Sequence, residues 1–169
     1  MGLFDFLKGK EEPTPAPITF PVDLGAVTKG EYVSMENIPD PVFSTGVLGR
    51  CCGITPEEGK VYAPIDGKVT QVADTLHAVG LETNGIEILI HIGVDTVDMN
   101  GDGFSSKIKL NQSVKKGDLL VTMDLDKIQG AGHPTTVILV VTNTDDFSSV
   151  EEVGSGSVQS GDAVLRVHK

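Results

Sequence analysis

The chain has 169 residues, of which 39% are hydrophobic and 5% aromatic, with 20 glycines and 9 prolines. This length fits one domain that buries about two-thirds of its unfolded surface, and so many glycines and prolines favour short strands and turns over long helices. The formal net charge of −11 argues against nucleic-acid binding, which needs a basic surface, and instead suits encounters with basic partners.

The N-terminal residues separate into two short segments before the domain. Residues 1–10, "MGLFDFLKGK", have the apolar spacing of an amphipathic helical turn. We favour a frayed terminus over a weak membrane-surface or partner-docking helix for them. Residues 11–17, "EEPTPAP", have the composition of an extended linker, so the domain is expected to span residues 18–169. No signal peptide or membrane-spanning run is recognisable, and the cytoplasm is the expected compartment.

The rest of the sequence predicts an all-β fold, either an antiparallel sandwich or a barrel, because short apolar runs are cut by Gly, Asp and Asn. "TVILVVTN" (136–143) is a continuous apolar run, as expected of a strand buried on both faces. "SVKKGDLLVTM" (113–123) and "SVQSGDAVLRV" (157–167) share Ser-Val, two polar residues and Gly-Asp before an apolar strand. This repeat indicates two related halves that use the same turn.

The adjacent cysteines Cys51 and Cys52 do not indicate a disulfide framework, and a metal site would need further ligands at suitable spacing. We interpret both as reduced, partly buried thiols.

The run "GIEILIHIGVDTV" (85–97) places a titratable ring inside an apolar strand. Strand alternation predicts that its isoleucines at positions 88, 90 and 92 face the core. The opposite face is then expected to carry Glu87, Leu89, His91 and Asp95. Partly apolar surroundings would keep the imidazole of His91 neutral, with a lone pair available for nucleophilic attack.

A second histidine, His77, lies two residues after Thr75, and in an extended chain both side chains would share one face. The threonine hydroxyl could then hydrogen-bond a ring nitrogen and fix the tautomer. Thr-x-His alone is a weak signal. For His133, which precedes a proline, and His168, the penultimate residue, we favour structural roles.

On these residues the chain resembles the glucose-type IIA component of the bacterial phosphoenolpyruvate:sugar phosphotransferase system. "GIEILIHIGVDTV" is similar to that family's phosphohistidine signature, and "NIPDPVFSTGVLG", "VYAPIDGKV" and "VKKGDLL" extend the similarity over nearly the whole chain after the linker. The resemblance implies a compact antiparallel β-sandwich with jelly-roll and Greek-key elements, built from a duplicated motif.

The resemblance also implies roles for single residues. His91 would accept a phosphoryl group on Nε2 from the phosphocarrier HPr and pass it to the IIB domain of a glucose-family sugar permease. His77 would stabilise the transferring group, and Thr75 would orient His77. The residues that would face partners are Asp40, Val42, Phe43, Leu89 and Asp95. The chain departs from the family's enterobacterial members at Leu89 and Ala73, where they carry phenylalanines, and at Pro41.

Other functions fit the sequence less well. Biotinyl and lipoyl carrier domains need a modified lysine within a tripeptide that does not occur here, and lysostaphin-type zinc peptidases need a His-x-His pair that His91 lacks. His77 and His91 could still supply two ligands to a zinc shared with a partner. A purely regulatory protein that keeps the fold is a further alternative.

No cofactor is expected, and the lack of a Walker-type loop excludes nucleotide as the direct donor. The sequence leaves open the transported sugar, any regulatory targets, and whether the chain is part of a longer polypeptide. Its initial Met and terminal "RVHK" favour a free-standing small protein.

Overall fold

The computed structural model describes residues 19–169, and the expected N-terminal segment and linker (1–10 and 11–17) lie outside the described residues. Over residues 19–169, no helix has both the length and the apolar character needed to cross a membrane.

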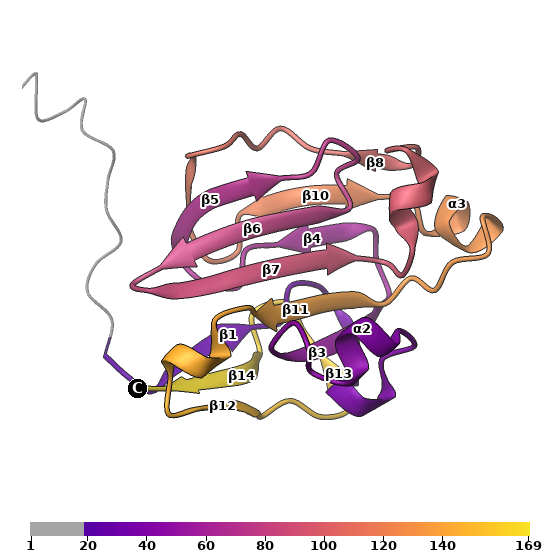
Figure 1. The fold of residues 1–169 in the computed structure, drawn as a ribbon. Helices are drawn as coiled ribbons and strands as arrows, with labels where there is room; N and C mark the ends of the chain where they lie inside the picture. Colours follow the sequence, from indigo (N-terminus) through magenta and orange to yellow (C-terminus); the bar gives the residue numbers. More distant parts are fainter. Residues whose placement is uncertain (1–18) are drawn as a thin grey trace, which may run out of the picture.

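Within residues 19–169 the backbone forms short strands with a few short helical turns between them (Figure 1). The strands of the first half are β1 (Val22–Gly25), β2 (Gly30–Val33), β3 (Arg50–Pro56), β4 (Lys60–Tyr62), β5 (Gly67–Val72), β6 (Ala78–Thr83) and β7 (Ile86–Ile92). Those of the second half are β8 (Phe104–Ser105), β9 (Ser113–Val114), β10 (Leu119–Met123), β11 (Val137–Val141), β12 (Ser149–Glu152), β13 (Ser157–Val158) and β14 (Ala163–His168). The helical elements are α2 (Pro41–Ser44), α3 (Leu125–Gly130) and the 3₁₀ turns η1 (Met35–Asn37), η2 (Thr96–Met99) and η3 (Thr144–Asp146).

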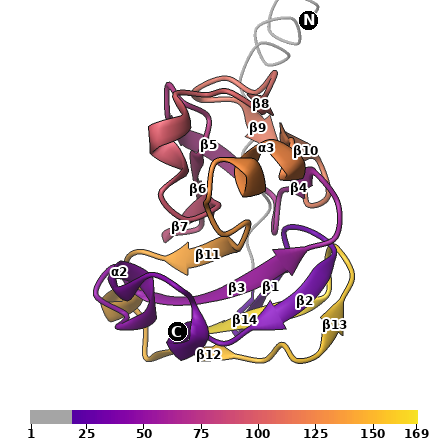
Figure 2. The same cartoon turned by 90° about the vertical axis from the view of Figure 1, so that its right-hand side faces the viewer.

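The main sheet has eight strands in the order β13-β2-β3-β11-β7-β6-β5-β9. Two three-stranded sheets, β1-β14-β12 and β4-β10-β8, complete the fold, and Figure 2 shows them toward opposite ends of the molecule. Neighbouring strands pair antiparallel throughout these sheets, for example β11 with β7 and β1 with β14. The all-β antiparallel sandwich predicted from the sequence is therefore confirmed.

The sequence repeat corresponds to a duplicated structural motif. In one copy β9 pairs with β5 and β10 with β4, and in the other β13 pairs with β2 and β14 with β1. Both repeats turn at a glycine in the left-handed region, Gly117 at φ 91° and Gly161 at φ 93°, a conformation that residues with a Cβ resist. Each glycine N–H donates to a matching carbonyl, that of Ala63 in one copy and Ala26 in the other. The two halves thus use the same turn.

The core lies between the main sheet and the two smaller sheets. Its fully buried side chains come from all three sheets, and examples are Leu24, Ile90, Leu120 and Leu165. Burial of such a side chain contributes about 2 kcal/mol to stability.

Strand β11 lies at the centre of the main sheet and is buried along its whole length, as its continuous apolar run predicts. Its odd-numbered residues join the main core. Its even-numbered residues, Ile138 and Val140, face the other side and pack in a second, smaller cluster with Ile38, Phe43, Cys51 and Val94. This second cluster supports the face of the sheet on which the histidines lie.

Candidate active site

Strand β7 places His91 on the outer face of the main sheet. Its isoleucines are buried, and Leu89 and His91 on the other face are half-buried, as the alternation predicts. His91 lies between Ala78 of β6 and Ile138 of β11 in the strand register. Two long neighbouring strands therefore hold the backbone of this histidine rigidly.

The alternation fails beyond the end of the strand, so the placement of Asp95 on the strand face was wrong. β7 ends at Ile92, Gly93 turns with φ 79°, and Asp95 itself has φ 60°. Asp95 is exposed in the loop that begins η2. Its carboxylate still lies close enough to His91 to favour the protonated ring.

Gly93 fixes the tautomer of His91. The ring Nδ1 lies 2.7 Å from the Gly93 carbonyl oxygen. A carbonyl only accepts hydrogen bonds, so Nδ1 must carry the proton and Nε2 must hold the lone pair. A Cβ at position 93 would lie 2.4 Å from Cγ2 of Thr96, so the turn that presents this carbonyl requires glycine. Sequence reasoning did not assign this function to Gly93.

Thr75 and His77 lie in the turn between β5 and β6, and the prediction of an extended chain there was wrong. Leu76 between them has φ 59°, so strand alternation does not bring their side chains together; the turn does. The Thr75 hydroxyl hydrogen-bonds Nδ1 of His77 in a short contact. The backbone carbonyl of His77 also accepts from Ile92 N–H at 2.7 Å, which anchors the turn beside the end of β7.

The two histidine rings are neighbours. Their centroids are 5.2 Å apart with an interplanar angle of 80°, so one ring presents its edge to the other. The Phe43 ring packs on the His91 ring with centroids 5.0 Å apart. Three segments distant in sequence thus meet at His91.

Helix α2 brings Phe43 to this position. Its N-cap, Asp40, accepts a hydrogen bond from Val42 N–H at 2.9 Å, a favourable arrangement at a helix start. Pro41 occupies the first helical position, where a missing N–H costs nothing. This departure from the enterobacterial pattern is therefore compatible with a helix. Phe43 is only 4% exposed, so most of its ring supports His91 and little of it faces solvent.

The environment favours the neutral form of both rings. Burial lowers the pKa of His91 below its ordinary value, and the nearby His77 lowers this pKa further. The hydrogen bond that the ring donates to the Gly93 carbonyl and the charges of Asp40 and Asp95 act in the opposite direction. Burial also lowers the pKa of His77. Because the neutral imidazole is the nucleophilic form, both shifts favour chemistry at Nε2 of His91.

Apolar side chains are exposed on the segments that flank the site. Val42 on α2 is 47% exposed, Val47 beyond α2 is 73% exposed, and Val97 on η2 is 48% exposed. Asp40 is half-buried, and Leu89 is half-buried against the second cluster. Such apolar side chains with a few carboxylates are typical of a protein-docking surface.

The other histidines and the two cysteines are not part of the site. His168 pairs with Glu151 at 2.7 Å, and the backbone N–H of His133 donates to Ile128. Cys51 and Cys52 are free thiols and fully buried, where partial burial was expected. No group of three or more His, Cys, Asp or Glu side chains arranged to hold a metal occurs in the described part of the chain. A zinc bound through His77 and His91 would therefore need ligands from outside the described residues.

A rigid β-scaffold with a tautomer-fixed histidine, a second histidine beside it and an open apolar surface defines a carrier that exchanges a small group with other proteins. A model of the family described as phosphoenolpyruvate-dependent sugar phosphotransferase system, EIIA 1, matches residues 22–147. The glucose-specific EIIA component from Bacillus cereus is 39% identical over 162 residues, which cover 95% of this chain and 92% of that protein.

Two further proteins are similar. The beta-glucoside-specific EIIBCA component from Bacillus subtilis is 45% identical over 140 residues, or 81% of this chain. This match covers 23% of that longer relative, so the chain spans less than a quarter of its length. Among solved structures, glucose permease IIA from Mycoplasma capricolum superposes with a TM-score of 0.79 at 32% identity, covering 90% of this chain and 99% of that one.

The chain therefore belongs to the EIIA 1 family of the sugar phosphotransferase system. It is a phosphotransferase component that carries a phosphoryl group, and a phosphocarrier protein and a IIB domain are the partners that this family implies.

Proposed function

We propose that His91 is the phosphoryl acceptor of this carrier and that Nε2 is the reacting atom. The observation that carries the proposal is the hydrogen bond from Nδ1 to the Gly93 carbonyl, because it leaves the lone pair on Nε2. In the acceptance step this lone pair forms the bond to phosphorus. The bond from phosphorus to the donor breaks, and its electron pair stays with the donor.

His77 is proposed to stabilise the group in transit. If the Thr75 hydroxyl donates to Nδ1 of His77, the proton of that neutral ring sits on Nε2. An Nε2–H beside the His91 ring can then donate to a phosphoryl oxygen, whose negative charge is the main feature that phosphoryl transfer asks a protein to stabilise. Thr75 is in this way a positioning residue for His77.

The donor is proposed to be HPr and the acceptor the IIB domain of a glucose-family sugar permease, in the cytoplasm. The net charge of −11 favours encounter with basic partner surfaces. The surface around Asp40, Val42, Leu89 and Asp95 is proposed as the docking site, with the buried Phe43 supporting it from beneath. A relay needs brief complexes, for which an interface of limited area is typical. The sugar is selected by the membrane component, and this chain does not define it.

The test is to incubate the protein with phosphoenolpyruvate, enzyme I and HPr and to map the product by mass spectrometry. A gain of about 80 Da, the mass of one phosphoryl group, on the peptide that contains His91 is expected. The bond should be labile in acid and stable in base. With an enzyme I and HPr pair shown to be active and compatible, no adduct, or an adduct on another residue, would contradict the proposal.

A further inference from the structure

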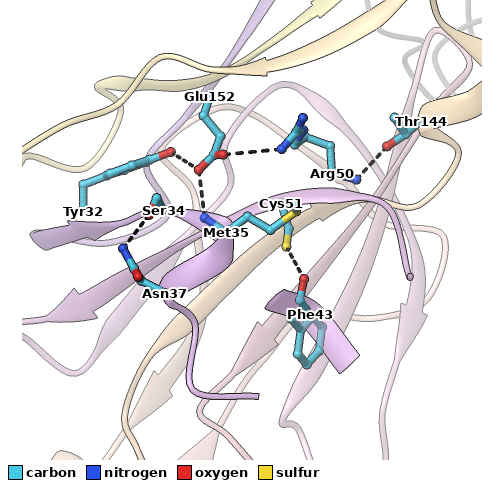
Figure 3. A network of polar contacts seen from close by, with 9 residues as sticks. All are labelled: Tyr32, Ser34, Met35, Asn37, Phe43, Arg50, Cys51, Thr144 and Glu152. Atoms are coloured by element: carbon cyan, nitrogen blue, oxygen red, sulfur yellow. Dashed lines mark hydrogen bonds and ion pairs between the residues drawn. The ribbon is translucent and has the colours of Figure 1, made fainter. Parts of the chain in front are cut away.

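A half-buried carboxylate that bonds neither His77 nor His91 connects three elements. Glu152 at the end of β12 accepts two hydrogen bonds on Oε1, from the Tyr32 hydroxyl at 2.7 Å and from Met35 N–H at 2.9 Å. Its Oε2 lies 3.6 Å from Nη1 of Arg50. Figure 3 shows these groups converging on the one carboxylate from β2, η1 and β3.

The segment that receives this contact, residues 34–46, carries α2. Many of its hydrogen bonds are internal: Asn37 N–H and its side chain both bond Ser34, and Thr45 bonds Pro41. The bonds that connect it to other elements include one from Met35 N–H to Glu152 and one from the Cys51 thiol to the Phe43 carbonyl at 3.4 Å. A helix of four residues gains little stability from its own bonds, so its position depends on such external contacts.

Packed side chains connect Met35 to His91. The Met35 side chain lies beside the loop after α2, where its Cε is 3.3 Å from the place of a Cβ on Gly46. It also packs on the second cluster, of which Phe43 is a buried member. The Phe43 ring in turn contacts the His91 ring. The path from Glu152 to the reacting histidine is therefore continuous through packed groups.

The charge state of the network supports this geometry. Burial, together with the hydrogen bond to Glu152, raises the pKa of Tyr32, so its hydroxyl remains a donor. Burial raises the pKa of Cys51 to about 12, so its thiol is also protonated and can donate to Phe43. The guanidinium of Arg50 lies close to the carboxylate and balances its charge.

We propose that Glu152 is a positioning residue for the phosphoryl-transfer site: by holding Met35 it fixes α2 and sets how Phe43 packs on His91. This inference rests on the proposed role of His91 as acceptor. Glu152 touches neither the histidines nor the transferred group, and it acts through the chain of contacts described above.

The experiment compares Glu152→Ala with Glu152→Gln, which retains an acceptor for Tyr32 and Met35, and with Tyr32→Phe, which removes one donor. The matched control is Asp23→Asn. It breaks an ion pair of 2.7 Å with Arg166 between β1 and β14, on strands that do not carry the site. The first readout is the ring-proton NMR spectrum of His91, which is sensitive to the Phe43 ring. The second is the rate of phosphoryl transfer from phosphorylated HPr.

Glu152→Ala is expected to move the His91 ring resonances and to slow transfer about threefold to tenfold, the effect of losing one or two partly buried hydrogen bonds. Glu152→Gln should keep the His91 resonances and the transfer rate close to those of wild type. Tyr32→Phe should change both readouts in the same direction as Glu152→Ala, but less. Asp23→Asn should change neither. If Glu152→Ala fails to fold, the His91 resonances and the transfer rate of Tyr32→Phe test the proposal instead.

A folded Glu152→Ala protein with unchanged His91 resonances and an unchanged rate would overturn the proposal. So would an equal change in Asp23→Asn, because the effect would then be one of general stability. If the wild-type protein takes no phosphoryl group, the proposed function fails. The NMR comparison of the free proteins still tests whether Glu152 positions the His91 environment.

Discussion

The ring of His77 stands edge-on to the ring of His91, with centroids 5.2 Å apart and planes at 80°. The backbone reinforces this pairing, since Ile92 N–H donates to the His77 carbonyl immediately beside His91. The two rings differ in how their Nδ1 atoms are held. That of His91 bonds a carbonyl, which only accepts, whereas that of His77 bonds a hydroxyl, which can also donate. The same ring type can thus serve as nucleophile in one place and as hydrogen-bond donor in the other.

This asymmetry predicts different losses for the two histidines. His91→Ala should take up no phosphoryl group, because the reacting nitrogen is absent. His77→Gln should still accept from phosphorylated HPr and should pass the group to a IIB domain about a hundredfold more slowly, as expected when a donor to the transferring group is misplaced. Both rates can be followed with radiolabelled phosphoenolpyruvate in a rapid-quench experiment. Equal acceptance by His91→Ala and wild type would refute the assignment.

The Thr75 hydroxyl should matter through the tautomer of His77. Thr75→Val removes the hydroxyl at nearly constant shape, so a larger fraction of neutral His77 should carry its proton on Nδ1, and onward transfer should slow about threefold to tenfold. Thr75→Ser should restore the wild-type rate. Two-bond ¹H–¹⁵N NMR spectra of the ring report the tautomer directly. Unchanged chemical shifts of the His77 ring nitrogens in Thr75→Val would show that Thr75 does not determine the tautomer of His77.

Phe43 should control how much water reaches His91. Phe43→Ala removes a buried ring, so the free energy of unfolding should fall by about 3 kcal/mol. Because burial is the main cause that lowers the pKa of His91, this pKa should rise toward its ordinary value. An NMR titration measures the shift. Phe147→Ala is the control, since Phe147 packs on Phe20 with ring centroids 6.0 Å apart and does not contact the site.

Stability should depend on pH through the same histidines. Both have a folded pKa below the ordinary 6.5, so between the folded and unfolded values the unfolded chain binds more protons. The contribution of the two histidines to stability is therefore fully present above about pH 6.5. It is lost as the pH falls from there to the pKa of the folded state. Urea unfolding between about pH 5 and pH 8 measures this slope. His77→Gln should show a shallower slope than wild type; an identical slope would exclude a contribution from His77.

The sequence was sufficient to predict the all-β class, the buried run of β11 and the outward direction of His91, because these follow from local periodicity and burial. The repeat at Gly117 and Gly161 also correctly predicted a shared turn. Two local expectations failed because left-handed residues interrupt alternation, Leu76 before His77 and Gly93 before Asp95. For Asp95 the sequence did contain a signal, because Gly93 directly follows the apolar strand and a glycine there indicates a turn.

Other features of the site have no local signal. Glu152 and Met35 are separated by 117 residues, and neither lies in a motif. The packing of Phe43 on His91 arises from α2 folding over β11, which no periodicity of either segment specifies. Contacts of this kind are set by tertiary topology, and only the folded structure brings them together.

The two cysteines provide a test of the cluster beneath the site. Cys51 and Cys52 are both fully buried, and burial raises the pKa of Cys51 to about 12 and that of Cys52 well above its ordinary value. Reaction requires an accessible thiolate, so neither thiol should react with Ellman's reagent in the native protein at neutral pH, and both should react in urea. Because Cys51 belongs to the cluster that contains Phe43, Phe43→Ala should expose Cys51 in preference to Cys52. Rapid labelling of either thiol in the native wild-type protein would show that this cluster is not closed in solution.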